Sequence, residues 1–443
     1  MPGLLRSLLG HWVDPADAYA ALFGDDTDVV WLDSGPGAKT GKSYLGRASR
    51  VITSEMVDSV LEFLRRDLAE RRMDVSGNGF ALGWVGWIGY ETRFETMRVS
   101  RSSRASGTAS GTDYPESVFL FIERAIEFDH ASGEVTLLAL GEMAEWREEV
   151  TRSLMQHPLL RGSNEPQKPS TAQWRDSDDE YLAMIGACKA AIAAGDAYQL
   201  CLTTQARADV RPDPVETYLA LRASSPSHHG ALLRICGISL LSSSPEQFLS
   251  VTPDGVIESR PIKGTRPRGI TAAEDVALAA ELRANEKERA ENLMIVDLMR
   301  NDIGRVSAIG SVEVPSLLAV ESYAQVHQLV STVRGQLEDG LVGMDAVVAC
   351  FPAGSMTGVP KSSATRILDA LEGHPRGIYA GAFGYFGLDG RIDLAMVIRS
   401  IVLSSDGASI GAGGGITALS DPDEELAEVK LKAAALLAVI GAS

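Results

Sequence analysis

The sequence has few cysteines and no long apolar run. Its four cysteines, Cys188, Cys201, Cys236 and Cys350, are widely spaced along 443 residues and form no Cys-x-x-Cys pair. This spacing argues against a disulfide framework and against a zinc site, so we expect reduced thiols. No apolar stretch is long enough to cross a bilayer, and Arg6 interrupts the short apolar start that a signal peptide would need. We therefore expect a cytoplasmic globular protein without a membrane partner.

Basic residues are in the minority. Lys and Arg total 41 against 59 Asp and Glu, which gives a formal net charge of −18. A surface of this sign repels a phosphate backbone, so the composition argues against a nucleic-acid partner. A small anionic substrate is compatible with it where Arg, Lys or a metal ion supplies local positive charge. The hydrophobic content of 45% is ample for a large packed core.

A glycine-rich segment near the start imitates a phosphate-binding loop but has the wrong spacing. Residues Gly35 to Ser43 read GPGAKTGKS after an apolar run. The motif requires a glycine five residues before Gly41, and Pro36 stands there without the backbone N–H that a phosphate cradle needs. The following stretch carries Gly46 in place of a helix-forming pattern. A nucleotide hydrolase is therefore a poor interpretation.

Two polar stretches divide the chain. Ser100 to Asp113 and Gly162 to Ala172 are poor in apolar residues and rich in residues typical of loops and linkers. We therefore predict an amino-terminal region at 1–165 and a carboxy-terminal region at 173–443.

Apolar periodicity predicts strands that follow one another without intervening helices. We expect strands at Val29 to Leu32, Phe80 to Gly89, Val118 to Phe128, Tyr379 to Phe386, Arg391 to Leu403 and Ala408 to Ile416. Helices are expected at Ser54 to Glu70, Ser177 to Ala194 and Ala272 to Met299. Consecutive strands joined by turns pair antiparallel, so the pattern predicts an α+β fold.

Two pairs of carboxylates have helical spacing. Glu288 and Glu291 lie three residues apart on one predicted helix, and Glu425 and Glu428 lie three apart on another. Each pair therefore projects from a single helix face. Four carboxylates that met across a cleft would suit Mg²⁺, which prefers oxygen ligands.

The second pair also has a purely structural interpretation. Glu425 belongs to the acidic first turn of a helix capped by Ser420 or Asp421, where negative charge is favourable. Glu428 lies four residues before Lys432 and could form an ion pair with it. The spacing alone leaves both interpretations open.

A loop and a glycine run are candidate ligand-binding segments. Phe351 to Lys361 (FPAGSMTGVPK) is rich in Gly, Ser and Thr and leads at Pro360 into a helix that runs to about Leu371. Hydroxyls and free N–H groups at a helix start favour an anion. In Ala412 to Ile416 the glycines let a ligand approach the backbone, and Arg399 could bind a carboxylate. A tight turn and a surface ion pair are the alternatives.

Lys263 is a candidate nucleophile. It stands in the segment Pro261 to Thr265 (PIKGT), with Arg260, Arg266 and Arg268 close by in sequence. A primary amine attacks only when unprotonated, and desolvation or neighbouring cations lower its pKa. On this segment alone, a solvated loop lysine is the alternative.

Taken together, these segments resemble the chorismate-binding enzymes. The resemblance is strong from about residue 175 onward and weaker before, at Trp31 to Ser34 and Gly83 to Glu91. The matching motifs are Gly195 to Gln199 (GDAYQ), Ser244 to Glu246, Arg260 to Thr265, Glu291 to Gly304, Phe351 to Lys361, Gly377 to Arg399 and Gly411 to Ile416.

The resemblance implies the fold and the roles of the site residues. It implies two large packed antiparallel sheets with outer helices and an active site in the cleft between them, as in component I of anthranilate synthase. It further implies that Mg²⁺ is held by Glu291 and Glu428, with Glu288 and Glu425 acting directly or through water. The implied substrate-binding residues, for chorismate, are Ser355, Thr357, Tyr379, Arg399, Gly413, Gly414 and Lys432.

Two positions indicate a branch of the family. Isochorismate and salicylate synthases carry a water-activating Lys where Gln199 stands here, and most branches, anthranilate synthases included, have Ala in place of Lys263. Aminodeoxychorismate synthases have the Lys. The resemblance thus implies amination of chorismate at C4, for 4-aminobenzoate and folate or a specialised product, through attack of Lys263 on C2. Glu246 is the implied candidate for the general acid.

A departure from the anthranilate synthase pattern points the same way. Gln328 occupies a place where those enzymes have His, which is associated with loss of pyruvate, while His327 stands beside it. The sequence shows no Gly-x-Cys-x-Gly nucleophile segment. We therefore expect ammonia to come free or from a separate glutamine amidotransferase subunit. Anthranilate synthase component I and a non-catalytic, partner-binding relative are the alternatives.

Overall fold

The computed structural model describes residues 1–443 except 1–2, 25, 76, 100–113, 157–169 and 324. The predicted linker Ser100 to Asp113 lies outside the described residues. The same holds for the predicted linker Gly162 to Ala172, apart from its last three residues.

The strands and helices alternate irregularly along the chain, as expected for an α+β protein. The strands are β1 (Leu4–Leu8), β2 (Val29–Asp33), β3 (Lys42–Thr53), β4 (Gly83–Ile88), β5 (Ser117–Asp129), β6 (Glu134–Leu140), β7 (Gln173–Trp174), β8 (Gln199–Ala208), β9 (His229–Ile235), β10 (Ile238–Ser244), β11 (Gln247–Val251), β12 (Val256–Ser259), β13 (Ile262–Pro267), β14 (Glu313–Ser322), β15 (Val326–Gln336), β16 (Gly358–Val359), β17 (Ala382–Gly387), β18 (Ile392–Met396), β19 (Ser400–Ser404) and β20 (Gly407–Ile416). The helices are α1 (Pro15–Phe23), α2 (Val60–Glu70), α3 (Arg93–Thr96), α4 (Ala144–Gln156), α5 (Asp178–Ala193), α6 (Pro214–Ser224), α7 (Ala272–Ala284), α8 (Glu286–Gly304), α9 (Gly343–Cys350), α10 (Lys361–Glu372) and α11 (Pro422–Val439), with short 3₁₀ turns η1 (Tyr90–Thr92) and η3 (Gly354–Met356).

The strands form one hydrogen-bonded network that divides into two sheets at β3 and β5. One sheet runs β1–β6–β5–β3–β2–β9–β10–β19–β20–β8, with β7 and β16 on β8. The other runs from β5 through β4, β17, β18, β11 and β12 to β15, which also pairs with β13 and β14. The named strands of the described residues pair antiparallel throughout, which confirms the predicted pairing.

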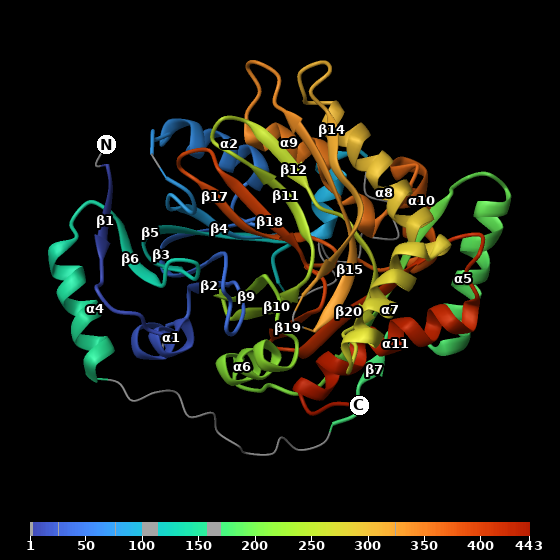
Figure 1. The fold of residues 1–443 in the computed structure, drawn as a ribbon, viewed down its shortest axis with the longest axis horizontal. Coiled ribbons are helices and arrows are strands. Elements are labelled where there is room, and N and C mark those ends of the chain that lie inside the picture. The colour runs from blue at the N-terminus through green and yellow to red at the C-terminus, as the bar shows by residue number, and fades with distance from the viewer. Residues whose placement is uncertain (1–2, 25, 76, 100–113, 157–169, 324) are drawn as a thin grey trace.

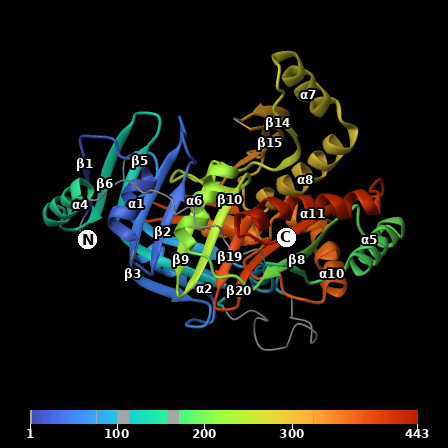
Figure 2. The same ribbon diagram turned by 90° about the horizontal axis from the view of Figure 1, so that it is seen from below.

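The two sheets pack face to face, and the alternation of side chains along β4 shows how. Val85 and Trp87 point into a buried cluster shared with residues of β2, β9, β10 and β19 from the other sheet. Trp84 and Ile88, one position out of phase, belong to a second cluster with α2, α8 and α9 on the outer face. Figures 1 and 2 show helices outside both sheets, with α5, α7, α8, α10 and α11 gathered on one side.

Strands from both predicted regions are direct neighbours. β2 pairs with β9, with Val30 opposite Leu233, and β4 pairs with β17, with Trp87 opposite Phe383. The sheets that carry the site therefore draw strands from 1–165 and from 173–443.

Two predicted elements are interrupted. The helix expected from Ala272 to Met299 is two helices, because Asn285 leaves helical geometry and its side chain accepts a hydrogen bond from the N–H of Glu288 to cap α8. The strand expected from Arg391 to Leu403 is also wrong as a single element. Its first half, β18, pairs with β17 and β11, whereas its second half, β19, pairs with β10 and β20. Arg399 lies in the crossing between them.

Other predicted elements are confirmed with small shifts at their ends. α5 matches the helix expected at Ser177 to Ala194, and α10 ends at Gly373 in the left-handed conformation. α2 begins at Val60, six residues later than expected, where Ser59 caps it. The phosphate-loop imitation joins the antiparallel strands β2 and β3, with no helix after it. None of the described helices is both long and apolar enough to cross a membrane.

Candidate active site

A cavity of about 520 Å³ lies beside β13, β20, α8, α11 and the turn η3. Figure 1 shows α8 and α11 beside β15 and β20 on one side of the molecule. The cavity brings together all but one of the predicted site residues, namely Glu246, Lys263, Glu288, Glu291, Ser355, Tyr379, Arg399, Gly413, Gly414, Glu425, Glu428 and Lys432.

A bulge in β13 presents Lys263 to this cavity. The register between β13 and β15 shifts between Ile262 and Thr265, so Lys263 and Gly264 form the irregular part of the strand. Gly264 has φ +80°, and a Cβ atom there would lie 3.0 Å from the Oε2 atom of Glu288. Glycine thus permits the left-handed backbone and lets the strand approach the carboxylate of α8.

The pKa of Lys263 is raised, opposite to the shift that a free amine would need. Burial acts to lower the pKa, but the charges of Glu291, Cys201, Glu246 and Glu428 outweigh it. The carboxylates around the ammonium group therefore favour the protonated form of Lys263.

The arginines near Lys263 in sequence do not act on it. Arg260 forms an ion pair with Glu321, and Arg268 binds Asp275 with Nη2–Oδ2 at 2.7 Å. Arg266 lines the cavity but forms ion pairs with Glu281 at 2.6 Å and Glu288 at 3.4 Å. Our expectation that these cations lower the Lys263 pKa is therefore wrong, because each is neutralised by its own carboxylate.

The four glutamates converge from two helices, and three of them have cationic partners. Glu288 accepts from Arg266, Glu425 forms an ion pair with Lys287 at 3.1 Å, and Glu428 forms one with Lys432 at 2.7 Å. The last contact is the structural pairing that the sequence left open. Asp421 is the N-cap of α11, so Glu425 also lies in its first turn. Helix capping and a role in the cavity are thus compatible.

Glu291 has no cationic partner among these ion pairs. It is buried, and burial raises its pKa, with further raising by the like charges of Glu288 and Glu425 and opposing effects from Lys263 and Lys287. Clustered carboxylates that repel one another favour a bound cation, and an all-oxygen donor set suits Mg²⁺. Within the described residues no three acidic, His or Cys side chains stand close enough together to count as a formed metal site. The oxygen donors therefore match the chemistry of Mg²⁺, whereas their side chains would have to move closer together to hold it.

Glu246 has a raised pKa. It lies in the turn between β10 and β11 and is buried, and burial raises its pKa to about 7 against the lowering effects of Lys263 and of a hydrogen bond from Ser355. A carboxylic acid with such a pKa can donate a proton at physiological pH. Its position beside Lys263 in one cavity matches the role of a general acid.

Arg399 and Ala380, the neighbour of Tyr379, have unusual backbone conformations. Arg399 has φ +52°, a left-handed conformation rarely adopted by a side-chain-bearing residue, and Ala380, next to Tyr379, has φ +64°. Strain of this kind is typical of functional sites. Burial lowers the pKa of Arg399, with opposing effects from Tyr379 and Glu428. With no salt bridge to a carboxylate among the described residues, its guanidinium can bind an anionic ligand.

The glycines of β20 make room for this arrangement. A Cβ atom at Gly411 would lie 2.1 Å from the Tyr379 ring, and one at Gly414 would lie 3.1 Å from Oε2 of Glu425. Lys432 donates a hydrogen bond to the carbonyl of Gly413 at 3.0 Å. The glycine run thus lets Tyr379 and the carboxylates reach the cavity, and Lys432 joins α11 to it.

Thr357 and His327 point away from the cavity. Thr357 is 0% exposed, and its hydroxyl donates to the carbonyls of Ala353 and Gly354, so it stabilises the loop that presents Ser355. His327 bonds with Ser322 and Asp275, whereas Gln328, its neighbour on the opposite face of β15, lines the cavity.

The sequence pattern missed two further residues of the cavity. Lys287 and Cys201 line it, the first as the partner of Glu425 and the second in the wall beside Lys263. The position of Lys287, one residue before Glu288 on the same helix, was a usable signal. Burial raises the pKa of the Cys201 thiol, so it behaves as an apolar wall group.

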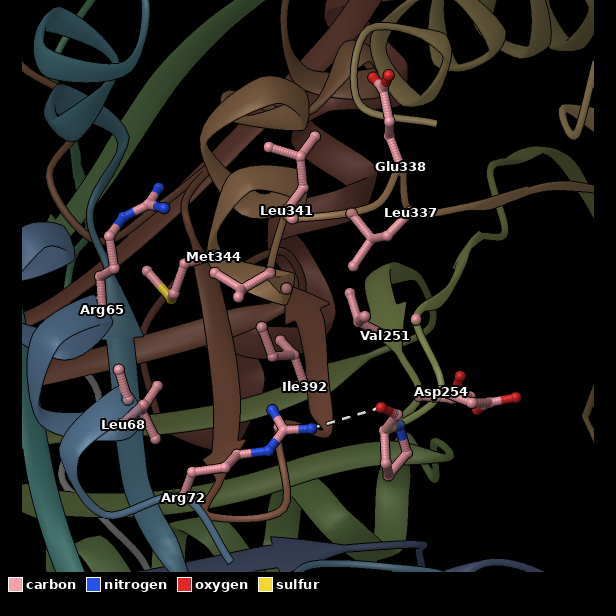
Figure 3. Close-up of a pocket in the computed structure, with 18 of the residues that line it drawn as sticks. Arg65, Leu68, Arg72, Val251, Asp254, Leu337, Glu338, Leu341, Met344 and Ile392 are labelled. Atoms are coloured by element: carbon pink, nitrogen blue, oxygen red, sulfur yellow. Dashed lines mark hydrogen bonds between the residues drawn. The ribbon is translucent and has the colours of Figure 1, made fainter. Parts of the chain in front are cut away.

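A second cavity of about 540 Å³ lies on another part of the surface, between α2, α9 and the turn after β11. Figure 3 shows Leu68, Val251, Leu337 and Ile392 around it, with Arg72 directed toward the carbonyl of Pro253. Its walls hold no lysine and no convergent carboxylates from facing helices. It therefore lacks the chemical groups found in the first cavity.

Comparisons with known proteins identify the family of this chain. The chorismate binding enzyme family model matches residues 27–438. An aminodeoxychorismate synthase of Streptomyces pristinaespiralis is 40% identical over 96% of this chain and 64% of its own length. Component 1 of the anthranilate synthase of Streptomyces coelicolor is 36% identical over 99% of this chain and 88% of its own length. The chain thus spans less than two thirds of the first of these relatives.

A solved structure supports the fold. Component I of the anthranilate synthase of Streptococcus pneumoniae superimposes with a TM-score of 0.76 at 28% identity, covering 98% of this chain and 99% of that one. The fold of two packed antiparallel sheets is thus the fold of this relative, and the family model matches most of the sequence. The chain belongs to the chorismate-binding enzymes.

Proposed function

We propose that this chain aminates chorismate at C4 with ammonia and produces 4-amino-4-deoxychorismate. The observation that carries the proposal is the placement of Lys263 and Glu246 in one cavity, a potential nucleophile beside an acid whose pKa is about 7. The similarity to aminodeoxychorismate synthases at 40% identity supports the same reaction.

The first step uses both residues. The Nζ atom of Lys263 attacks C2 of chorismate, both ring double bonds shift (C1=C2 to C1=C6 and C5=C6 to C4=C5), and the C4–O bond breaks. Glu246 gives a proton to the departing hydroxyl, which leaves as water. The lysine must first lose its own proton, so the carboxylates that raise its pKa must be neutralised before attack.

The second step reverses the first with a different nucleophile. Ammonia attacks C4, both ring double bonds shift back, and the C2–N bond to Lys263 breaks. The lysine nitrogen loses a proton after its attack, which restores the proton that Glu246 gave up, and the added ammonia loses one, which the departing lysine takes up. The net reaction joins chorismate and ammonia and releases one water, and the enolpyruvyl group is retained.

The remaining residues bind and orient the substrate. Arg399 and Tyr379 would hold one carboxylate, with the glycine backbone around Gly413 beside it and Ser355 close by. Mg²⁺ would be held by Glu291 and Glu428, with Glu288 and Glu425 next to them, and would supply positive charge to a substrate carboxylate. Lys432, bonded to Gly413 and Glu428, would link the two groups.

We infer that the ammonia comes from a glutamine amidotransferase, a separate subunit in our proposal. The 443 residues contain no Gly-x-Cys-x-Gly segment, so the proposal places the amidotransferase outside them. Assays of this chain therefore need an added ammonium salt. The substrate ammonia must be unprotonated, so the rate at fixed total ammonium should rise with pH until the enzyme's own groups titrate.

A product assay tests the proposal. The protein with chorismate, Mg²⁺ and ammonium chloride should form 4-amino-4-deoxychorismate, which a lyase converts to 4-aminobenzoate for detection. Omission of ammonium is the control. Anthranilate as the main product would identify the chain as component I of an anthranilate synthase instead, and no product from bound chorismate would identify a non-catalytic relative.

A further inference from the structure

A buried carboxylate from the amino-terminal half accepts hydrogen bonds from the backbone that leads to Tyr379. Glu91, in η1, accepts hydrogen bonds from the N–H of Arg376 at Oε1 and from the N–H of Gly377 at Oε2, both at 2.9 Å. The N–H of Tyr90 donates to the carbonyl of Gly377 at 2.8 Å. Three backbone groups two residues before Tyr379 are therefore fixed by a segment nearly 300 positions earlier in the chain.

The side chain of Arg376 also donates hydrogen bonds to two segments that line the cavity. It forms a forked contact with Glu372 at 2.7 and 2.8 Å, and it also donates to the carbonyls of Met356 at 2.6 Å and Cys201 at 2.9 Å. The guanidinium is only 4% exposed and lies 4.3 Å from the centroid of the Tyr90 ring. Its donors thus join α10, η3 and β8, three elements that are distant in sequence.

The segments held in this way carry groups of the proposed reaction. Met356 follows Ser355, which bonds with Glu246, and Cys201 lies in the wall beside Lys263. Gly377 has φ +66° and Ala380 has φ +64°, so the turn that carries Tyr379 adopts left-handed backbone on both sides of that residue. A turn with this geometry needs external hydrogen bonds to keep its shape.

The cost of burying Glu91 argues that it has a specific task. Its carboxylate is 6% exposed and bonds only with backbone N–H groups among its hydrogen bonds in the described residues. Burial raises its pKa to about 7, with the Arg376 and Gly377 N–H groups and the charge of Arg93 acting against this and Glu116 adding to it. An apolar residue at this place would leave two buried N–H groups unsatisfied.

We propose that Glu91 is a positioning residue that, together with Arg376, holds Tyr379 and the Ser355 loop in the geometry that binds the substrate. The amino-terminal half thereby takes part in shaping the site without contacting the substrate. The inference rests on the proposed function, because it assumes that the cavity binds chorismate.

Glu91→Gln tests this inference with little change of shape. The amide oxygen can accept from one of the two N–H groups, while the amide NH₂ faces the other. Asp67→Asn is the matched control, because Asp67 is also a buried carboxylate that accepts from Trp84 and Arg71, but it touches no segment of the cavity. Both variants lose hydrogen bonds to a buried acid, so a similar fall in Tm is expected.

The two variants should differ at the site. For Glu91→Gln we expect the Kd and KM for chorismate to rise roughly 10- to 100-fold, as small displacements of binding groups do. Hydrogen exchange should quicken at residues 376–380 and 354–357. Asp67→Asn should keep the wild-type Kd, KM and exchange at those residues. Equal Kd and KM for Glu91→Gln and wild type, with a lower Tm, would reduce Glu91 to a structural role and overturn the inference.

A second variant covers the case in which Glu91→Gln does not fold. Arg376→Lys keeps the charge beside Glu372 but loses the fork that reaches Met356 and Cys201. A folded Arg376→Lys protein with wild-type chorismate affinity and exchange at 354–357 would also overturn the inference. Titration of the wild-type protein with chorismate separates the two proposals. If the wild type binds no chorismate, the proposed function is refuted. If the wild type binds chorismate and the variants bind it equally well, only the positioning role is refuted.

Discussion

Lys287 of α8 donates from Nζ to Oε1 of Glu425 on α11 at 3.1 Å, so a lysine neutralises one of the four carboxylates of the cavity. The same ion pair joins the two helices that carry the carboxylates. In the proposed function a divalent cation would also bind Glu425, so Lys287 would compete with it for this carboxylate.

We expect Lys287→Met to tighten Mg²⁺ binding, because the competing cation is removed. Lys287 is 39% exposed in its side chain, and pairs of this kind contribute only about 0.2–1 kcal/mol, so the gain should be no more than about fivefold. Calorimetric titration with Mg²⁺ measures it without reference to turnover. Lys430→Met, which removes the partner of Asp178 outside the cavity, should leave Mg²⁺ affinity unchanged. Weaker Mg²⁺ binding in Lys287→Met would show that the lysine orients Glu425 for the metal.

Glu291→Gln and Glu428→Gln should raise the Mg²⁺ concentration needed for activity. Each removes one negative charge with little change in shape, and turnover should fall by at least the roughly 10- to 100-fold that supporting residues of metal sites cost. Excess EDTA should abolish wild-type activity, and added Mg²⁺ should restore it. Wild-type activity of both variants at limiting Mg²⁺ would leave Glu428 as the partner of Lys432 and Glu291 as a buried acid without a metal.

Much of the site follows from the sequence because helical spacing fixes which side chains share a face. Glu288 and Glu291, and likewise Glu425 and Glu428, line the cavity from one face of each helix as the i, i+3 spacing predicts. The antiparallel pairing of the last strands also follows from turns between apolar runs. Helical spacing and turns between neighbouring strands are local properties, so they can be predicted from the sequence.

The partners of charged groups do not follow from the sequence. The arginines beside Lys263 bind Glu321, Glu281 and Asp275, which lie 7 to 61 residues away in the chain, and no periodicity identifies such partners. The raised pKa of Lys263 results from carboxylates on other elements. The same limit applies to Asn285 and Arg399, where a helix cap and a crossing between sheets interrupt runs that appear continuous.

The acid role of Glu246 predicts a specific pH dependence. Its pKa is raised to about 7 by burial, so the protonated acid is present below pH 7 and is lost as the pH rises through 7. When the concentration of free NH₃ is held constant at each pH, kcat should therefore decline above about pH 7. Glu246→Gln should abolish this decline and lower kcat by roughly 10²- to 10⁴-fold, typical of a lost acid. An unchanged alkaline limb in that variant would assign the titration to another group.

The covalent role of Lys263 can be separated from a purely electrostatic one. Lys263→Ala should lose amination by at least about a thousandfold, as is usual when a nucleophile is removed, while chorismate binding persists because Tyr379 and Arg399 are unchanged. Lys263→Arg should be equally inactive, since a guanidinium stays protonated and cannot attack C2. Mass spectrometry of wild type quenched with chorismate but without ammonium should reveal an adduct on Lys263. An Arg variant with near-native turnover would show that Lys263 supplies only positive charge, and the covalent mechanism would have to be abandoned.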